Sequence, residues 1–207
     1  MDKIIINDIA YTLSEIEKLA WQKLTTAGVK SRIPFHTPTF CSVREGMPNM
    51  RTIVLRKTYT EAKQLLFHSD KRCGKIGEIE ANPNVGFLFY DASARIQIRL
   101  WGTAEVISDG QLVDERWQVS TLSSRKCYLT DSSPGSVSVK PNPGVPFEFL
   151  DRDPTEEESR AGRANFAVVR TTISRMDWLY LKHDGNSRAI FEYDENQVIT
   201  NQYWSIP

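Results

Sequence analysis

The chain has 207 residues, of which 40% are hydrophobic and 25% are charged, and its 26 basic residues balance 26 acidic residues. This length suits one domain with a substantial core, and the composition is that of an ordinary folded protein. A zero net charge provides no overall attraction to nucleic acid or to an anionic membrane surface. We therefore expect neither nucleic acid nor a membrane as a partner.

The cysteine and histidine positions argue against several kinds of site. The three cysteines, Cys41, Cys73 and Cys127, are odd in number and widely spaced, so they form neither a disulfide framework nor a zinc motif. The three histidines are also far apart, and we expect no metal site. The N-terminal segment has no apolar run of signal-peptide length, and no segment has the apolar length of a membrane span. These features predict a cytoplasmic protein in a reducing compartment.

The N-terminal half is predicted to combine two helices with short strands. Residues 14–27 are expected to form a helix in which Ser14 and Glu17 make a capping box. A shorter helix is expected over residues 74–82, where Pro83 stops it. The strands expected from β-rich or alternating runs lie at 38–44, 50–57, 64–69, 85–91 and 95–107.

The C-terminal half contains a long loop. Residues 130–148 hold four prolines and two glycines without a helical or strand period, which is typical of a functional or disordered connection. Helices are expected over 109–122 and 151–160, the second capped by Asp153 with Pro154 at its first position. Further strands are expected at 165–172, 175–182, 187–194 and 201–206, with a hairpin turn at 183–186. Strands joined by short turns favour an antiparallel sheet, and a closed or split barrel protects the edges of so many short strands.

Two of the predicted strands carry polar side chains that suit a bound cofactor. Within RTIVLRK at 51–57, Arg51 lies near one end of the strand and Arg56 near the other, on opposite faces. Gln97 lies on an otherwise alternating strand, and its amide can both donate and accept, as recognition of a flavin or base edge requires. Solvated strand positions are the alternative for all three residues, because exposed polar side chains are common.

The turn before the helix at 74–82 suits a phosphate group. A strand ends at His68 and Ser69, and a basic turn that contains glycine leads into the helix. Free backbone N–H groups and the positive end of the helix attract an anion, and Arg72 or Lys75 adds charge. A solvated basic turn is the alternative, since lysines are common in strand–turn–helix connections.

The segments RTIVLR, LLFHSDKRCGKIGEIEANPNVGFLFY and RIQIRLWGTAEVI, in this order, resemble the pyridoxamine 5′-phosphate oxidase family over about residues 35–108. The resemblance implies a mainly β fold with flanking helices, namely an antiparallel FMN-binding split β-barrel of six or more strands. It also implies a single domain over residues 1–207 that works as a homodimer, with a core at 35–108. C-terminal strands at 164–207 would complete the site, and their aromatic residues could line the interface or cover the flavin: Trp178, Tyr180, Tyr203 and Trp204.

The resemblance assigns the first FMN contacts to the strand at 50–57. Arg51 corresponds to residues that bind the FMN phosphate. Thr52, Val54 and Leu55 would lie beside the isoalloxazine ring, with backbone groups reaching its polar edge. Arg56 stands where the family usually has a lysine beside flavin and substrate. This agrees with the chemistry, because a phosphate dianion needs converging cations and a flat ring needs an apolar strand surface.

The resemblance places the remaining FMN contacts further along the chain. His68 and Ser69 correspond to an aromatic–hydroxyl pair, although histidine replaces tyrosine here. Lys75 corresponds to the lysine of a Ser-Arg-Lys run that holds the phosphate. That run reads Cys-Gly-Lys in this chain, so Arg72 would compensate for the missing arginine. Gln97 corresponds to a glutamine that contacts the flavin.

The substrate half of the family pattern is altered. In place of the family's Arg-x-His motif the chain has Asn-Ser-Arg, ending at Arg188. Residues 117–128 resemble the family's substrate-phosphate segment only loosely, with Ser124 or Arg125 as candidates. The run Pro-Asn-Pro-Gly at 141–144 resembles a PxPG loop of divergent FMN-binding relatives. We therefore assign Arg125 and Arg188 as substrate-site candidates and name no catalytic residue.

The pattern supports three functions to different degrees. The first is an FMN-dependent oxidoreductase, related to pyridoxamine 5′-phosphate oxidase, that acts on an unidentified small molecule. The second is a flavin-binding or flavin-carrier protein without catalysis, which the altered substrate motif also fits. The third is a split barrel that has lost its flavin and has a structural or haem-linked role. The cofactor residues argue against this third function: Arg51, Arg56, Lys75 and Gln97.

Overall fold

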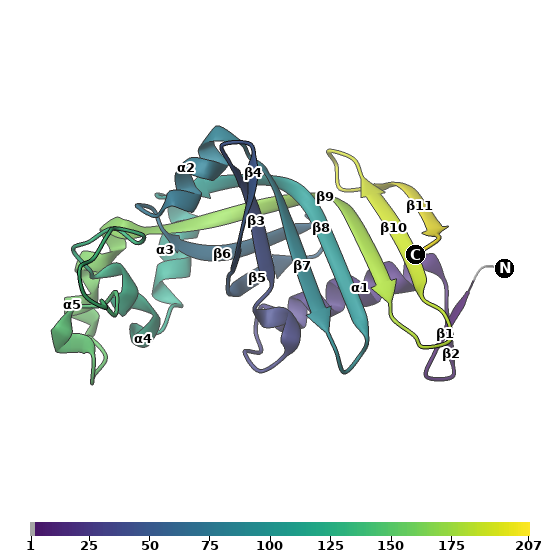
Figure 1. The fold of residues 1–207 in the computed structure, drawn as a ribbon, viewed down its shortest axis with the longest axis horizontal. Coiled ribbons are helices and arrows are strands. Elements are labelled where there is room, and N and C mark those ends of the chain that lie inside the picture. Colours follow the sequence, from purple (N-terminus) through teal and green to yellow (C-terminus); the bar gives the residue numbers. More distant parts are fainter. Residues whose placement is uncertain (1–2) are drawn as a thin grey trace. The chain divides into compact units, whose positions relative to one another are not determined.

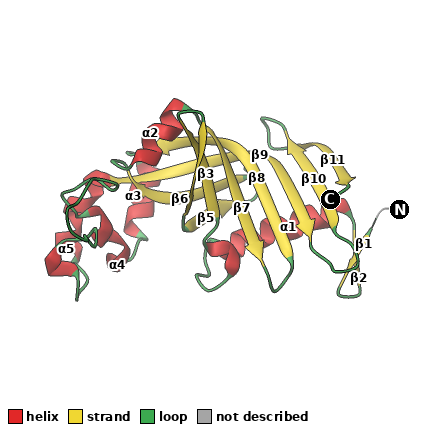
Figure 2. Ribbon diagram, viewed as in Figure 1, coloured by secondary structure: helices red, strands yellow, loops and turns green. Residues whose placement is uncertain are grey.

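The computed structural model describes residues 3–207 and consists mainly of antiparallel strands (Figures 1 and 2). The described chain divides into two compact units. Unit 1 comprises residues up to Phe67, Asn82–Ala104 and Arg170–Pro207, and unit 2 comprises His68–Ala81 and Glu105–Val169. Within residues 3–207, no helix is both long and apolar enough to cross a membrane.

Nine strands form one large sheet. Its main path runs β11-β10-β9-β8-β7-β3-β4, and β6 pairs with both β9 and β5 as a branch. Although β4 and β5 follow each other along the chain, they are not neighbours in the sheet, so the barrel is split between them. This confirms the predicted antiparallel split barrel. The strands are β3 (Thr39–Arg44), β4 (Met47–Thr52), β5 (Leu55–Tyr59), β6 (Gln64–Asp70), β7 (Asn84–Asp91), β8 (Ile96–Ile107), β9 (Phe166–Tyr180), β10 (Ser187–Tyr193) and β11 (Ile199–Ser205).

The core of unit 1 follows from the period-2 pattern of its strands. Phe87 and Phe89 of β7, with Ile98 and Leu100 of β8, are buried, whereas the residues between them point to the other face. Phe40 of β3 pairs with Phe87, and their ring centroids lie 5.2 Å apart. The alternation seen in the sequence therefore sorts the apolar side chains onto the inner face of the sheet.

Helix α1 (Leu13–Ala27) packs against β5 and β11 in unit 1. Its capping box is formed by Thr12 and Glu15, so the predicted pair of Ser14 and Glu17 was wrong. Thr12 is extended, with φ −79° and ψ 167°, and its hydroxyl accepts the Glu15 amide as a cap requires. Glu17 instead lies one turn inside the helix, where it is buried and bonds to Lys63.

The strand predicted at 50–57 is two strands, which corrects the prediction. The chain leaves the β4 ladder after Thr52 and enters β5 at Leu55. At the break, the Ile53 amide donates to the Pro38 carbonyl over 3.1 Å. The sequence across the break is apolar and β-branched, as is typical of a strand. The two strands and the break between them are therefore predicted as one uninterrupted strand.

Two strands predicted at 165–172 and 175–182 are the single strand β9, a second correction. β9 can continue because it pairs with β6 and β8 as well as β10. The structure also contains a hairpin that was not predicted, formed by β1 (Ile4–Ile6) and β2 (Ile9–Tyr11). Its turn places Asn7 and Asp8 at φ 49° and 63°, a conformation that these residue types tolerate.

Unit 2 is largely helical and has a small aromatic core. The rings of Trp117, Tyr128 and Phe166 pack edge to face, with centroids 5.1 to 5.9 Å apart. The helix predicted over 109–122 extends only over Gln111–Gln118. The last helix is capped by Thr155 and not, as predicted, by Asp153. In the loop predicted at 130–148, residues 130–146 contain neither helix nor strand, whereas residues 147 and 148 belong to a 3-10 turn. The helices of unit 2 are α2 (Gly74–Ala81), α3 (Gln111–Gln118), α4 (Leu122–Arg125) and α5 (Glu156–Ser159), with short 3-10 turns η2 (Lys126–Tyr128), η3 (Phe147–Phe149) and η4 (Arg160–Asn165); η1 (Pro34–His36) belongs to unit 1.

Candidate functional site

Arg51 ends the inner row of side chains on β4. It pairs with Phe40 of β3, and its guanidinium lies 5.7 Å from the centroid of that ring. One guanidinium nitrogen donates to the Ser42 hydroxyl. The next residue, Thr52, is exposed on the opposite face of β4. The strand therefore holds the arginine half-buried at the rim of the core and presents the threonine outward.

Arg56 occupies an irregularity in the ladder. In the pairing of β5 with β6, Leu55 lies opposite Phe67 and Lys57 lies opposite Leu66, so Arg56 is an extra residue without a partner position. A bulge of this kind redirects a side chain and is frequent beside functional sites. Arg56 is half-buried and has no ion-pair partner within the described part of the chain. Val54, at the break before β5, is also half-buried, whereas Leu55 belongs to the core.

Gln97 lies on the outer face of the sheet. It is half-buried on β8 directly opposite Tyr90 of β7, between the buried residues Ile96 and Ile98. Tyr90 is 50% exposed, so this part of the outer face combines an amide with an aromatic ring. The same face carries Thr52, because Thr52, Thr39 and Leu88 form one lateral row.

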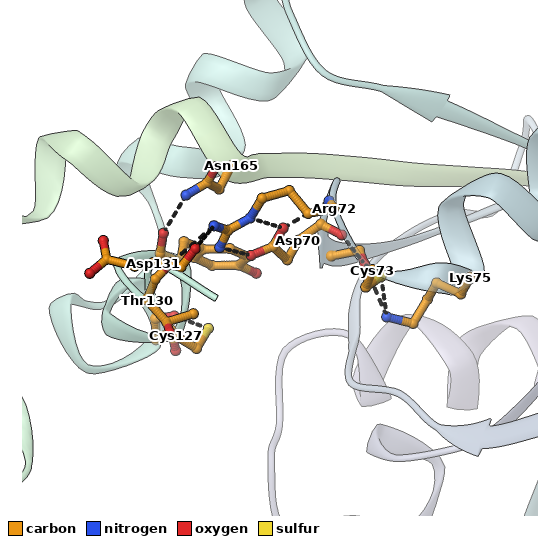
Figure 3. Close-up of polar contacts among 11 residues, drawn as sticks. Asp70, Arg72, Cys73, Lys75, Cys127, Thr130, Asp131 and Asn165 are labelled. Atoms are coloured by element: carbon orange, nitrogen blue, oxygen red, sulfur yellow. Dashed lines mark hydrogen bonds and ion pairs between the residues drawn. The ribbon is translucent and has the colours of Figure 1, made fainter. Parts of the chain in front are cut away.

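The turn between β6 and α2 gathers several polar groups of unit 2. The Lys75 ammonium donates to the Ser69 hydroxyl at 3.1 Å and to the Cys73 sulfur at 2.9 Å (Figure 3). Ser69 and Cys73 are buried, and the Ser69 hydroxyl lies 3.1 Å from the Cys73 sulfur. His68 is half-buried, with its ring centroid 4.8 Å from that of Phe166. The structure therefore brings Ser69 and Lys75 together, and Cys73 joins them.

Arg72 points away from Lys75, although it was expected to share the phosphate (Figure 3). Its Nε and Nη2 donate to the two carboxylate oxygens of Asp70 at 3.0 and 2.7 Å. Its Nη1 donates to the carbonyl oxygens of Thr130 and Asp131 at 2.9 and 3.4 Å. Hydrogen bonding to Asp70 raises the pKa of the Arg72 guanidinium above its ordinary value. All three guanidinium nitrogens thus have acceptors within unit 2, and the role of Asp70 was missed in the sequence.

Arg125, a substrate candidate, is 2% exposed and is also fully engaged. Its guanidinium donates to the Ser159 hydroxyl at 3.1 Å, to the Trp117 carbonyl at 3.2 Å and to the Glu156 carboxylate at 2.5 Å. It lies 4.8 Å from the centroid of the Trp117 ring. These contacts give Arg125 a structural place in unit 2 and leave it little access to a substrate.

Arg188, the other substrate candidate, lines a cavity of about 750 Å³ in unit 1. Its Nε and Nη2 donate to the buried Asp177 carboxylate, with a shortest distance of 2.7 Å, and Asp177 also accepts from Arg99. The cavity wall combines cationic and aromatic side chains, among them Lys3, Lys182, Tyr180, Trp204 and Arg188. The structure therefore places Arg188 at an open site, in contrast to Arg125.

Comparisons with known proteins bear on this arrangement. Residues 18–108 match the family model described as pyridoxamine 5′-phosphate oxidase, FMN-binding domain. This stretch, which is less than half of the chain, is similar to the FMN-binding domain of that family, and the match supports FMN as the cofactor. The match includes the residues expected at the FMN site and excludes Arg125 and Arg188.

Relatives of the FMN-binding domain are similar over different lengths of chain. A pyridoxine/pyridoxamine 5′-phosphate oxidase from Caulobacter vibrioides is 30% identical over 67 residues, which cover 32% of this chain and 29% of that protein. A pyridoxamine 5′-phosphate oxidase-related FMN-binding protein from Nostoc punctiforme has a TM-score of 0.71 at 21% identity, covering 92% of this chain and 96% of that chain. PhzG from Burkholderia lata has a TM-score of 0.66 at 17% identity, covering 92% and 91%. The two structures show a shared fold.

The donor set of unit 2 fits the phosphate of FMN. Among residues 3–207, Lys75 has hydroxyl and thiol partners but no carboxylate within ion-pair distance, so its charge is not neutralised. It lies in the first turn of α2, where backbone N–H groups and the helix dipole add positive potential. In the same described residues, no cluster of three or more His, Cys, Asp or Glu side chains could hold a metal ion.

Proposed function

We propose that this chain is an FMN-dependent oxidoreductase related to pyridoxamine 5′-phosphate oxidase, with an altered substrate site. The observation that carries the proposal is the uncompensated Lys75 ammonium at the start of α2. A cation beside a helix N-terminus is well suited to a phosphate group. Bound FMN would supply hydride and electron transfer, whereas the protein would supply binding, orientation and electrostatics.

For unit 1, the proposal keeps Arg51 as a phosphate contact and the strand residues around it as flavin contacts. The outward faces of Thr52 and Gln97, and the uncommitted guanidinium of Arg56, support these roles. Positive charge on Arg56 would stabilise negative charge that develops on a reduced flavin. The remaining contacts kept from the family resemblance are Val54, Leu55, His68 and Ser69.

We also propose that the protein forms a homodimer through the outer face of β4, β3, β7 and β8. One lateral row on this face reads Met50, Cys41, Gly86 and Trp101, with Met50 66% exposed and Trp101 39% exposed. Leu88, at 39% exposure, lies in the adjacent row. Contiguous exposed apolar surface of this kind is typical of a protein interface.

Light scattering after size exclusion tests the dimer. The expected mass is twice the 23.7 kDa of one chain. Leu88→Glu should shift the protein to the monomer, because it buries a charge in the proposed interface. Val29→Glu, at a 79% exposed position outside that face, is the matched control and should remain dimeric. A monomeric wild type would exclude the proposal.

The cavity beside Arg188 is the proposed substrate site. Arg188 uses one edge of its guanidinium for Asp177, and its Nη1 has no acceptor among residues 3–207. Lys3 in the same wall adds positive charge, whereas Lys182 is paired with Asp184 at 2.9 Å, so the cavity favours a small anionic molecule through Lys3 and Arg188. Tyr180 offers a flat apolar surface. Arg188→Gln should raise KM for such a substrate more than it lowers kcat.

A flavin-binding protein without catalysis is the second candidate. The observation that favours it is Arg125, whose burial and saturated guanidinium remove one of the two substrate candidates. The two functions differ in turnover. Reduction of bound FMN by pyridoxamine phosphate or by a nicotinamide under anaerobic conditions would favour the oxidoreductase, and failure with a broad panel of anionic amines and nicotinamides would favour the binding protein.

Flavin binding by Lys75 is tested by spectroscopy and titration. The purified protein should show flavin absorption and release FMN on denaturation. Lys75→Met should weaken FMN binding about ten- to a hundredfold, because a charge-assisted contact contributes roughly 1.5–3 kcal/mol. Lys71→Met, at an exposed lysine on the same turn, is the control and should bind FMN like wild type. Equal affinity in both variants would refute the phosphate assignment.

A further inference from the structure

Asp70 and Arg72 form a closed polar unit at the end of β6 (Figure 3). Asp70 is 7% exposed, and its carboxylate accepts the Arg72 backbone amide at 2.8 Å as well as two guanidinium nitrogens. An aspartate that binds the amide two residues later fixes the backbone of a turn. This pair therefore restricts the backbone of the turn that leads to Lys75.

The same guanidinium reaches the start of the long loop. Arg72 Nη1 donates to the carbonyl oxygens of Thr130 and Asp131 at 2.9 and 3.4 Å. A second link runs parallel to it, because the Lys71 amide donates to the Asn165 carbonyl at 2.8 Å and the Asn165 side chain donates to the Tyr128 carbonyl at 2.9 Å. The turn and the first residues of the loop are thus joined by hydrogen bonds to backbone carbonyls, which fix main-chain position.

The rest of the loop has little else to hold it. Residues 131–144 are exposed with the exception of Ser133, and residues 130–146 lack helix and strand. Segments with few buried contacts open at low free energy. The hydrogen bonds from Arg72 to the Thr130 and Asp131 carbonyl oxygens are therefore important for the position of the loop where it leaves the rest of unit 2.

We propose that Arg72 is a positioning residue, which with Asp70 clamps the start of loop 130–146 to the proposed phosphate turn. A chain of contacts connects the two ends: Lys75 bonds Cys73, the Cys73 amide donates to the Asp70 carbonyl at 3.2 Å, and Asp70 holds Arg72. An anion bound at Lys75 stiffens this turn and so orders the loop. The coupling rests on the proposed FMN site, whereas the clamp itself exists without flavin.

Arg72→Met tests the clamp, with Arg163→Met as a matched control. Arg163 is equally exposed, at 24% against 22%, and also binds a carboxylate, Asp114, and a backbone carbonyl, Ser108, elsewhere in unit 2. Hydrogen exchange and limited proteolysis of residues 130–146 are measured without flavin, with FMN and with riboflavin, which lacks the phosphate. Asp70→Asn combined with Arg72→Met removes both charges and provides a second variant should Arg72→Met fold poorly.

The expected result has two parts. Arg72→Met should raise the exchange and cleavage rates of residues 130–146 at least tenfold without flavin, whereas Arg163→Met should leave them within twofold of wild type. FMN should slow exchange in the wild-type loop more than riboflavin does, and Arg72→Met should abolish this difference while keeping FMN affinity within threefold.

Other outcomes overturn the proposal in distinguishable ways. Unchanged loop exchange in Arg72→Met would refute the clamp. A loss of FMN affinity in Arg72→Met equal to that in Lys75→Met would show that Arg72 is a phosphate ligand, as the sequence suggested. If Lys75→Met binds FMN like wild type while Arg72→Met frees the loop, the proposed phosphate site fails and the clamp stands, but the coupling to flavin is refuted.

Discussion

Lys63 and Glu17 form a buried ion pair in unit 1 whose removal we expect to be costly. The ammonium lies 2.8 Å from the Glu17 carboxylate, with side-chain exposures of 12% and 7%. It also lies 5.0 Å from the ring centroid of Trp21 and 5.2 Å from that of Tyr193. Burial raises the pKa of Tyr193, so its hydroxyl stays protonated and donates to Glu17 at 3.0 Å.

Lys63→Met keeps the aliphatic length and removes the charge. Glu17 is then left as a buried carboxylate that keeps the hydrogen bond from the Tyr193 hydroxyl but has lost its cation. Breaking a buried ion pair in this way lowers the free energy of unfolding by about 3–5 kcal/mol. The lost cation–π contacts are part of this figure, at roughly 0.5–2 kcal/mol each. Combining Lys63→Met with Glu17→Gln removes both charges and should recover a measurable part of the loss.

Urea denaturation, followed by tryptophan fluorescence, measures these differences. Lys57→Met is the matched control, because Lys57 lies 5.6 Å from the Tyr59 ring centroid and forms no ion pair among the described residues. It should cost about 1 kcal/mol or less. A loss below about 1 kcal/mol in Lys63→Met, or a double variant no more stable than the single one, would refute the reasoning.

Two further predictions concern packing and ionisation. Gly102→Ala should prevent stable folding, because its Cβ would lie 2.1 Å from the Thr172 carbonyl oxygen, whereas Gly77→Ala meets no atom within 4 Å and should raise the melting temperature through helix propensity. Hydrogen bonding from Arg152 lowers the pKa of Glu158 from 4.5 to about 2, so its contribution to stability is present above pH 4.5 and is lost as the pH falls toward 2. An NMR titration should show this midpoint in wild type and a rise in Arg152→Gln; an unchanged midpoint would contradict the assignment.

The turn and helix that carry Lys75 could be predicted because their signals are local. Gly74 opens α2, Pro83 follows its end, and the apolar run after it is long enough for one buried strand. The outer and inner faces around Gln97 followed from strict alternation along β8. In both cases short-range pattern and tertiary burial agree, which is why the sequence was sufficient.

The other features depend on partners far along the chain. Arg72 and Asp70 are near neighbours, yet the acceptor carbonyl of Thr130 lies 58 residues beyond Arg72 and leaves no trace in composition. Arg125 looked available because Glu156 and Ser159, which occupy it, come from a later helix. Whether a guanidinium group already has hydrogen-bond partners depends on the folded structure around it. The sequence therefore identifies the arginine but not the groups that it binds.

Asp177 is shared by two guanidinium groups, and this has a consequence for binding in solution. One negative charge faces the positive charges of Arg99 and Arg188, so the cluster keeps a net charge of +1 beside the cavity in unit 1. Arg99 and Arg188 are 39% and 26% exposed, so mobile ions reach the cluster. Salt screens charges over a Debye length of about 8 Å at physiological ionic strength. Occupancy of this cavity by anionic ligands should therefore fall as salt is added, most steeply for the most highly charged ligands.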